Sequence, residues 1–99
     1  MRTVVTAKRL SDGGRIVDNP MVVIDDGVIA SVATRSAADL PAPADHLDFP
    51  HATLAPAFFD VHIHGASGHD VMEATPEALS DISGFLAMRG TFSYLVTTV

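Results

Sequence analysis

The chain contains no cysteine and no tryptophan, and only 6 of its 99 residues are lysine or arginine. Without cysteine, disulfide frameworks, thiolate zinc sites and thiol catalysis are excluded, and the absence suits the reducing cytoplasm. The 12 acidic residues give a formal net charge of −6, which argues against nucleic-acid and anionic membrane partners. No apolar run reaches the roughly 20 residues of a membrane-spanning helix. We therefore expect a cytoplasmic protein with neither kind of partner.

The composition is that of a chain that builds a hydrophobic core. Hydrophobic residues make up 47% of the chain and charged residues 18%, which excludes a disordered segment. The length fits one small domain. The last residues, 97–99 (TTV), lie in an apolar, β-branched stretch where a strand is expected. We expect from this ending that the chain is the first part of a longer protein.

Residues 1–34 have the pattern of a β-meander. Asp26 and Gly27 separate two apolar runs, and an Asp-Gly pair in that position is a strong hairpin signal because both residues accept positive φ. Residues 12–14 (DGG) form a second turn signal. The strands expected around these turns cover residues 4–6, 15–17, 21–24 and 28–32.

Residues 35–50 change in character and predict a loop or linker with a short returning strand. Alanine and proline dominate the stretch, at Ala37, Ala38, Pro41, Ala42, Pro43 and Ala44. Residues 46–49 alternate between polar and apolar and predict the short strand. His46 and His51 flank this region, and a surface role is expected for both.

Residues 51–99 read as strand, loop, helix and strand. Thr75 and Pro76 form a helix start, and Gly90 is expected to end that helix in a left-handed conformation. The helix buries an apolar stripe of Leu79, Ile82 and Leu86. A strand–helix–strand order with an apolar second strand predicts parallel pairing, so this half is expected to open a larger α/β fold.

The sharpest chemical feature is the pair His62 and His64 at the end of the first of these strands. Side chains two residues apart on a strand point the same way, so two imidazoles can share one metal ion at about 2.0–2.1 Å each. A bare His-x-His also occurs by chance, and two exposed strand histidines need bind nothing. A following glycine loop favours the metal interpretation, because active sites of parallel barrels lie at the strand ends.

Residues 54–65 (LAPAFFDVHIHG) resemble the first barrel strand of the amidohydrolase superfamily, which usually reads Pro-Gly-Phe-Ile-Asp-x-His-x-His. More narrowly, three segments resemble the N-acetylglucosamine-6-phosphate deacetylase family: residues 64–70 (HGASGHD), 72–79 (MEATPEAL) and 89–98 (RGTFSYLVTT). Ala57 stands where the family has glycine, and Phe92 replaces a usual threonine. A positive φ at Ala57 would cost about 1–2 kcal/mol.

The resemblance implies an α/β fold in two parts. Residues 1–50 would form a segment of a small β-sandwich, and residues 51–99 the first β-α-β unit of an incomplete (β/α)8 TIM-type barrel. His62 and His64 would be ligands of a divalent metal, zinc or iron, which lowers the pKa of bound water to about 7. The substrate would be N-acetylglucosamine 6-phosphate, cleaved to glucosamine 6-phosphate and acetate, and the full-length enzyme would be a homodimer.

The family needs a glutamate and two further histidines as ligands, and an aspartate as general acid and base. All lie beyond these 99 residues, so no catalytic residue is expected within the chain and the chain alone is predicted to be inactive. Two alternatives stay open. One is another superfamily enzyme, such as a dihydroorotase-like, imidazolonepropionase-like or deaminase enzyme. The other is a non-catalytic, stand-alone remnant domain.

The remaining polar residues of this half have weaker indications. Asp60 either orients an imidazole or is satisfied by neighbouring backbone amides. Asp70 is expected to organise the glycine loop through side-chain bonds to backbone. Gly65 and Gly68 permit close backbone approach or positive φ, although a plain turn explains them equally well. His69 is expected to be a solvated loop residue without a partner.

Overall fold

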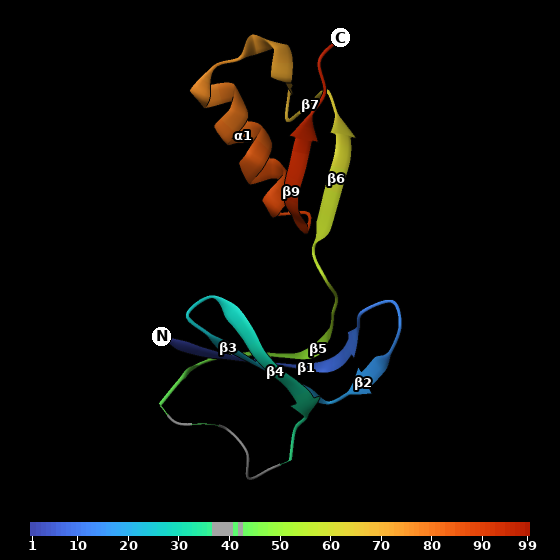
Figure 1. Ribbon diagram of the computed structural model, residues 1–99, viewed down its shortest axis with the longest axis vertical. Coiled ribbons are helices and arrows are strands. Elements are labelled where there is room, and N and C mark those ends of the chain that lie inside the picture. Colours follow the sequence, from blue (N-terminus) through green and yellow to red (C-terminus); the bar gives the residue numbers. More distant parts are fainter. Residues whose placement is uncertain (37–40, 42) are drawn as a thin grey trace. The chain divides into compact units, whose positions relative to one another are not determined.

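The structure is a computed structural model that describes residues 1–36, 41 and 43–99. The chain forms two compact units, Met1–Pro56 and Ala57–Val99 (Figure 1). Four residues of the expected linker, 37–40, and residue 42 lie outside the described residues. The predicted boundary between residues 50 and 51 falls inside a strand, because that strand continues to Leu54. The N-terminal unit therefore extends to Pro56.

The N-terminal unit is one five-stranded sheet built around its first strand. Its strands are β1 (Arg2–Ser11), β2 (Ile16–Asp18), β3 (Pro20–Asp25), β4 (Val28–Thr34) and β5 (Asp45–Leu54). β1 pairs antiparallel with β2 and β3 and parallel with β5, while β3 pairs antiparallel with β4. The antiparallel hairpins of β1 with β2 and of β3 with β4 are confirmed. In the described part of the chain β3 pairs with β1 and not with β2, so the strand order β2-β1-β3-β4 differs from that of the predicted meander. β5 adds a parallel neighbour to β1.

The returning strand is longer than the sequence predicts. β5 covers residues 45–54, not only 46–49. Its register against β1 shifts between Ala7 and Arg9, which pair with Phe49 and Thr53. Pro50 lies in this irregular stretch, where its missing N–H interrupts no regular ladder. His46 and His51 both lie on β5, and both are exposed, as the expected surface role requires.

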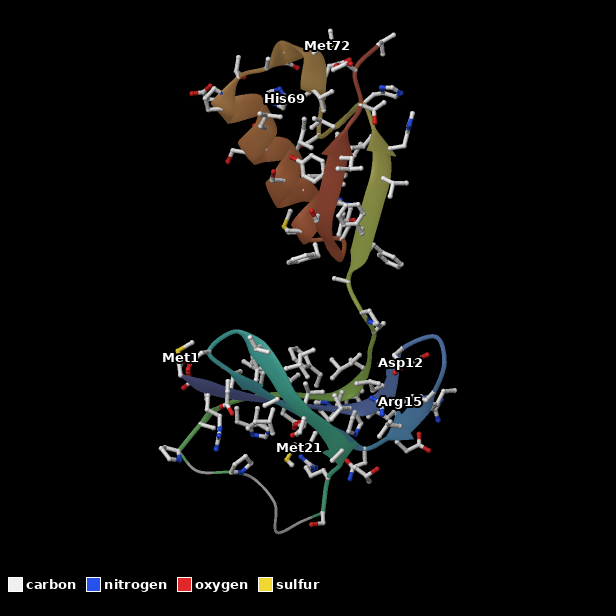
Figure 2. All side chains as sticks on the ribbon, viewed as in Figure 1. Met1, Asp12, Arg15, Met21, His69 and Met72 are labelled. Carbon is white, nitrogen blue, oxygen red and sulfur yellow. The ribbon has the colours of Figure 1, made fainter. Side chains whose placement is uncertain are left out.

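The turns of the N-terminal unit follow the sequence signals. Asp26 has φ 50° and Gly27 φ 81°, as the hairpin between β3 and β4 requires. In the other turn, the Asp12 carboxylate accepts hydrogen bonds from the backbone N–H groups of Gly14 at 3.0 Å and Arg15 at 2.9 Å. Asp12 and Arg15 also form an ion pair and are labelled in Figure 2.

The N-terminal sheet buries a small aliphatic core with one polar member. Its buried apolar residues are Val4, Ala7, Leu10, Pro20, Val22 and Val23. The Thr6 side chain is also buried, with its hydroxyl donating to the Asp48 carboxylate at 2.5 Å and lying 2.8 Å from His46 Nε2. These bonds join β1 to β5, so the polar group is buried without being left unpaired.

The C-terminal unit places one α-helix against a pair of parallel strands (Figure 1). Its elements are β6 (Phe58–Ile63), β7 (Gly65–Ala66), β8 (His69–Asp70), the short 3₁₀-helix η1 (Val71–Glu73), α1 (Pro76–Ala87) and β9 (Thr91–Val96). β6 pairs parallel with β9, and β7 pairs antiparallel with β8. The predicted parallel pairing is confirmed.

Helix α1 begins as predicted. The Thr75 hydroxyl accepts the Ala78 N–H at 3.2 Å, and Pro76 occupies the first turn. The buried side chains of the helix are Ala78, Ile82 and Leu86, a four-residue spacing. Leu79 is only half-buried. The buried residue at the start of the stripe is Ala78, so the prediction of Leu79 is wrong by one position.

The core of the C-terminal unit joins the helix to the strands. Val71, Ile82 and Leu86 form its buried centre, with Ile63, Ala66, Phe85 and Tyr94 packed around them. The helix ends at Ala87, and Gly90 follows with φ 84°, so the left-handed glycine belongs to the turn that leads into β9. Within the described part of the chain, no helix is long and apolar enough to cross a membrane.

Ala57, which departs from the family pattern, carries no left-handed strain. Non-glycine residues with positive φ in the described part of the chain are Asn19, Asp26, Ser67 and Ala74. Ala57 is not among them, so the strain energy that a positive φ would cause at this residue is absent.

Candidate metal-binding site

The two histidines of the His-x-His motif meet at the end of β6. His62 and His64 lie on the same side of the strand, with their Nε2 atoms 3.1 Å apart. Their ring centroids are 4.8 Å apart, with an angle of 88° between the ring planes. Both side chains are exposed. The sequence spacing therefore produces a pair of imidazole nitrogens that face one another and remain accessible.

The protonation of His64 follows from its second ring nitrogen. Nδ1 lies 2.9 Å from the backbone carbonyl oxygen of Thr97. A carbonyl oxygen only accepts hydrogen bonds, so Nδ1 carries the proton and Nε2 presents a lone pair. In the metal-free chain the Nε2–H of a neutral His62 can donate to the Nε2 atom of His64, and His62 would present a lone pair there once its proton is on Nδ1. This tautomer of His64 is the one that leaves Nε2 free for a metal ion.

The spacing of the two nitrogens fits a shared divalent ion. Two nitrogens at about 2.0–2.1 Å from one metal lie about 2.9 Å apart at a right angle and about 3.3 Å apart at the tetrahedral angle. The observed separation of 3.1 Å falls between these values. Within the described residues, no group of three or more histidine, cysteine, aspartate or glutamate side chains is placed to hold a metal. The geometry of the described residues therefore makes His62 and His64 two candidate ligands.

Asp60 and Gly65 shape the backbone on either side of the pair. The Asp60 carboxylate accepts the His62 N–H at 3.1 Å, which favours the backbone alternative over contact with an imidazole. At Gly65, an added Cβ would lie 2.1 Å from the His69 carbonyl oxygen. The β7–β8 hairpin thus requires glycine at this position, because no side chain fits between the two strands.

Asp70 supports the helical turn that follows the glycine loop. Its carboxylate accepts the Met72 N–H at 2.8 Å, and Glu73 accepts the Asp70 N–H at 2.8 Å, forming a capping box. The expected side-chain-to-backbone role is therefore present, but it organises η1 and not the glycine loop. Because Val71 is part of the core, this cap ties the loop after the histidines to the interior.

His69 is not the solvated, unpartnered residue that the sequence suggests. Its Nδ1 lies 3.1 Å from a Glu73 carboxylate oxygen, and its Nε2 lies 3.2 Å from Asp81 on α1. His69 itself is labelled in Figure 2. The hydrogen bond with Glu73 is the main cause that raises the pKa of His69 above its ordinary value of 6.5. The pKa of Glu73 is lowered, first by the Asp70 N–H and then by His69.

Sequence reasoning missed Thr97 and Asp81. Thr97 directly follows β9, and β6 and β9 run parallel. Residues just after two parallel neighbours meet at one edge of the sheet, so the predicted pairing already contained the signal that Thr97 adjoins His64. Asp81 reaches His69 from a helix position 12 residues away, and nothing local indicates that contact.

The sequence matches known sugar-phosphate deacetylases over its whole length. N-acetylgalactosamine-6-phosphate deacetylase of Escherichia coli O157:H7 is 34% identical over 99 residues, covering 100% of this chain and 24% of that protein. N-acetylglucosamine-6-phosphate deacetylase of Bacillus subtilis (strain 168) is 36% identical over 89 residues, covering 85% of this chain and 21% of that protein. The chain thus spans about a quarter of the length of these relatives. No family model matches it.

Solved structures agree on the fold. The crystal structure of N-acetyl-D-glucosamine-6-phosphate deacetylase from Mycobacterium smegmatis matches with a TM-score of 0.83 and 23% identity, covering 98% of this chain and 27% of that chain. A Xaa-Pro dipeptidase matches with a TM-score of 0.61 and 20% identity over 95% of this chain and 26% of its own. At identities of 23% and 20%, these two structures support only the arrangement of the strands and the helix.

Proposed function

The chain is a homologue of the N-acetylglucosamine-6-phosphate deacetylases, and we propose that it supplies two metal ligands, His62 and His64, to a deacetylase of N-acetyl-amino-sugar 6-phosphates. The single observation that carries the proposal is the 3.1 Å separation of the two Nε2 atoms, with the tautomer of His64 set by the Thr97 carbonyl. The sequence match to deacetylases over the whole chain supports it independently.

A divalent ion bound there, zinc or iron, would act as a Lewis acid and make water nucleophilic at neutral pH. The residues of this chain would bind and position that ion and would not themselves react. His62 and His64 present nitrogens, Asp60 fixes the peptide that leads into His62, and Gly65 lets the following hairpin close. We place the remaining ligands and the general acid and base in residues outside this chain, because the described residues hold no third ligand nearby.

The proposal assigns β6, α1 and β9 to the opening of a (β/α)8 barrel. Both histidines then lie at the carboxyl end of a barrel strand, where active sites of that fold are built. Parallel pairing of β6 and β9 with a connecting helix supports this placement. The first five strands would belong to the small β-sandwich that precedes the barrel in the amidohydrolase superfamily.

The proposed substrate class is an acetamido sugar carrying a 6-phosphate, because the relatives' names include both the glucosamine and the galactosamine forms. The whole enzyme would act in the cytoplasm, which the absence of cysteine suits. Assembly as a homodimer rests on the family resemblance alone. The deacetylase matches favour this substrate class over those of the other superfamily enzymes, and over a remnant domain without chemistry.

A chimera tests the proposal. This chain replaces the matched 99 residues of the Escherichia coli deacetylase, and acetate release from N-acetylgalactosamine 6-phosphate is measured with added Zn²⁺. We expect turnover that a chelator abolishes and that zinc restores. Substituting His62→Ala and His64→Ala in the chimera should abolish turnover, whereas the matched change His51→Ala on β5 should not. A folded, zinc-loaded chimera that releases no acetate would refute the proposal.

A further inference from the structure

Thr97 makes three hydrogen bonds to Ile63, the last residue of β6, and to His64, which follows it. Its N–H donates to the Ile63 carbonyl at 2.8 Å, and its hydroxyl accepts the Ile63 N–H at 3.3 Å. Its carbonyl accepts the Nδ1–H of His64 at 2.9 Å. The main chain and the side chain of one residue therefore hold both the peptide before His64 and the His64 ring.

The ladder between β6 and β9 is irregular close to this end of the sheet. β9 ends at Val96, so Thr97 lies just beyond the last ladder residue. The register between β6 and β9 shifts between Asp60 and Ile63. Thr97 is half-buried, and its hydroxyl joins the strands at this irregular point, so it helps to fix how close the Thr97 carbonyl comes to the imidazole.

We propose that Thr97 is a positioning residue, whose hydroxyl fixes its own carbonyl against His64 and so selects the Nδ1–H tautomer with Nε2 open to a divalent cation. The metal role of that nitrogen rests on the proposed function. The tautomer selection does not, because it follows from the hydrogen bonds of the chain alone. A histidine ligand held by a backbone carbonyl keeps its ring orientation and the basicity of its free nitrogen.

Three substitutions separate the hydroxyl from other effects. Thr97→Val removes the hydroxyl but keeps the β-branched shape, and Thr97→Ser keeps the hydroxyl. Thr98→Val is the matched control, because the neighbouring side chain is exposed and makes no hydrogen bond in the part of the chain that the structure describes. The readout is the ¹⁵N spectrum of the imidazole nitrogens in the full 99-residue chain, with amide spectra to verify folding.

In the wild-type chain, His64 should show a protonated Nδ1 and an unprotonated Nε2. Thr97→Val should shift His64 toward a mixture of the two tautomers, whereas Thr97→Ser and Thr98→Val should keep the wild-type spectrum. A wild-type His64 that carries its proton on Nε2 would overturn the proposal, whether or not any variant folds. A folded Thr97→Val chain with an unchanged tautomer would overturn it as well.

Titration with Zn²⁺ alone separates this inference from the proposed function. Thr97→Val should raise the zinc Kd about tenfold, the lower end of the effect of partners behind a ligand, and Thr97→Ser should restore it. If zinc leaves both imidazole spectra unchanged while the tautomer is as stated, the metal site fails and the positioning role stands. If zinc binds equally well to wild type and Thr97→Val, the positioning role fails and the metal site stands.

Discussion

The two units of the chain differ in what surrounds their polar side chains, although ion pairs and side-chain bonds to the main chain occur in both. In the N-terminal unit, charged residues pair with one another at the surface, as in Arg2 with Asp25 and Arg9 with Asp18. In the C-terminal unit, the oxygens of Asp60 and Thr97 accept main-chain N–H groups beside the two histidines. Exposed ion pairs contribute little, whereas bonds to the main chain fix where a side chain points. In the C-terminal unit these bonds lie beside the candidate ligands, whereas the Asp12 carboxylate of the N-terminal unit uses the same kind of bond to close a turn.

One glycine from each unit shows a second contrast. Gly27 serves a hairpin turn through its positive φ and has open space around it. Gly65 has another strand 2.1 Å from its missing Cβ and allows two backbones to meet beside the histidines. The first glycine satisfies a local need that its own turn dictates. The second satisfies a contact that only the folded unit creates.

The largest expected effect is the loss of metal binding when one imidazole is removed. His64→Ala should raise the zinc Kd more than about 100-fold, beyond the effect of altering a residue behind a ligand. His51→Ala, an exposed histidine on β5, should leave the Kd unchanged. Isothermal calorimetry on both folded variants makes the comparison. Equal affinities would mean that zinc binds elsewhere on the chain.

The next largest effect is the loss of stability when a buried side chain of α1 is shortened. Ile82 is fully buried, so Ile82→Ala should lower the free energy of unfolding by about 2–5 kcal/mol. Leu79→Ala, at a half-buried position, should cost clearly less. Urea unfolding followed through amide resonances of α1 measures both. Equal losses would show that Leu79 belongs to the core, as the sequence pattern predicts and the structure does not.

A smaller effect concerns pH and the bridge from His69 to Glu73 and Asp81. The folded-state pKa of His69 is raised above 6.5. Protonated His69 therefore contributes its full stabilisation of the folded state below pH 6.5, and this contribution is lost as the pH rises through the folded pKa. The free energy of unfolding should therefore fall with rising pH more in wild type than in His69→Gln. Urea unfolding across this window compares them. Parallel pH curves would show that the bridge adds nothing.

The smallest effect is expected for a surface ion pair of the N-terminal unit. Arg9 and Asp18 lie 3.0 Å apart, with both side chains largely exposed. Arg9→Gln should change the free energy of unfolding by less than about 1 kcal/mol, and added salt should reduce the difference further. Urea unfolding at low and high salt measures it. A loss as large as that of Ile82→Ala would contradict the contrast between the units.

The sequence predicts the features that depend on neighbouring residues. The hairpin turn at Asp26 and Gly27, the helix start at Thr75 and the meeting of His62 with His64 all follow from spacings of one to three residues. Local backbone geometry decides each of them, so no tertiary information is needed.

The features that the sequence did not reveal depend on distant partners. β5 extends through Pro50 because pairing with β1 tolerates a register shift there. His69 gains Asp81 only when α1 folds back beside β8. Burial of Ala78 in place of Leu79 reflects how the helix is rotated against Val71 and the strands. In each case tertiary packing overrides the local pattern.

The most direct test of the central claim is a zinc titration of the 99-residue chain, followed by the ¹⁵N resonances of its histidine side chains. The account predicts that zinc shifts the Nε2 resonances of His62 and His64 together, at the same zinc concentration, while those of His46 and His51 stay in place. Zinc that shifts only one member of the pair, or that leaves both unchanged, would contradict it.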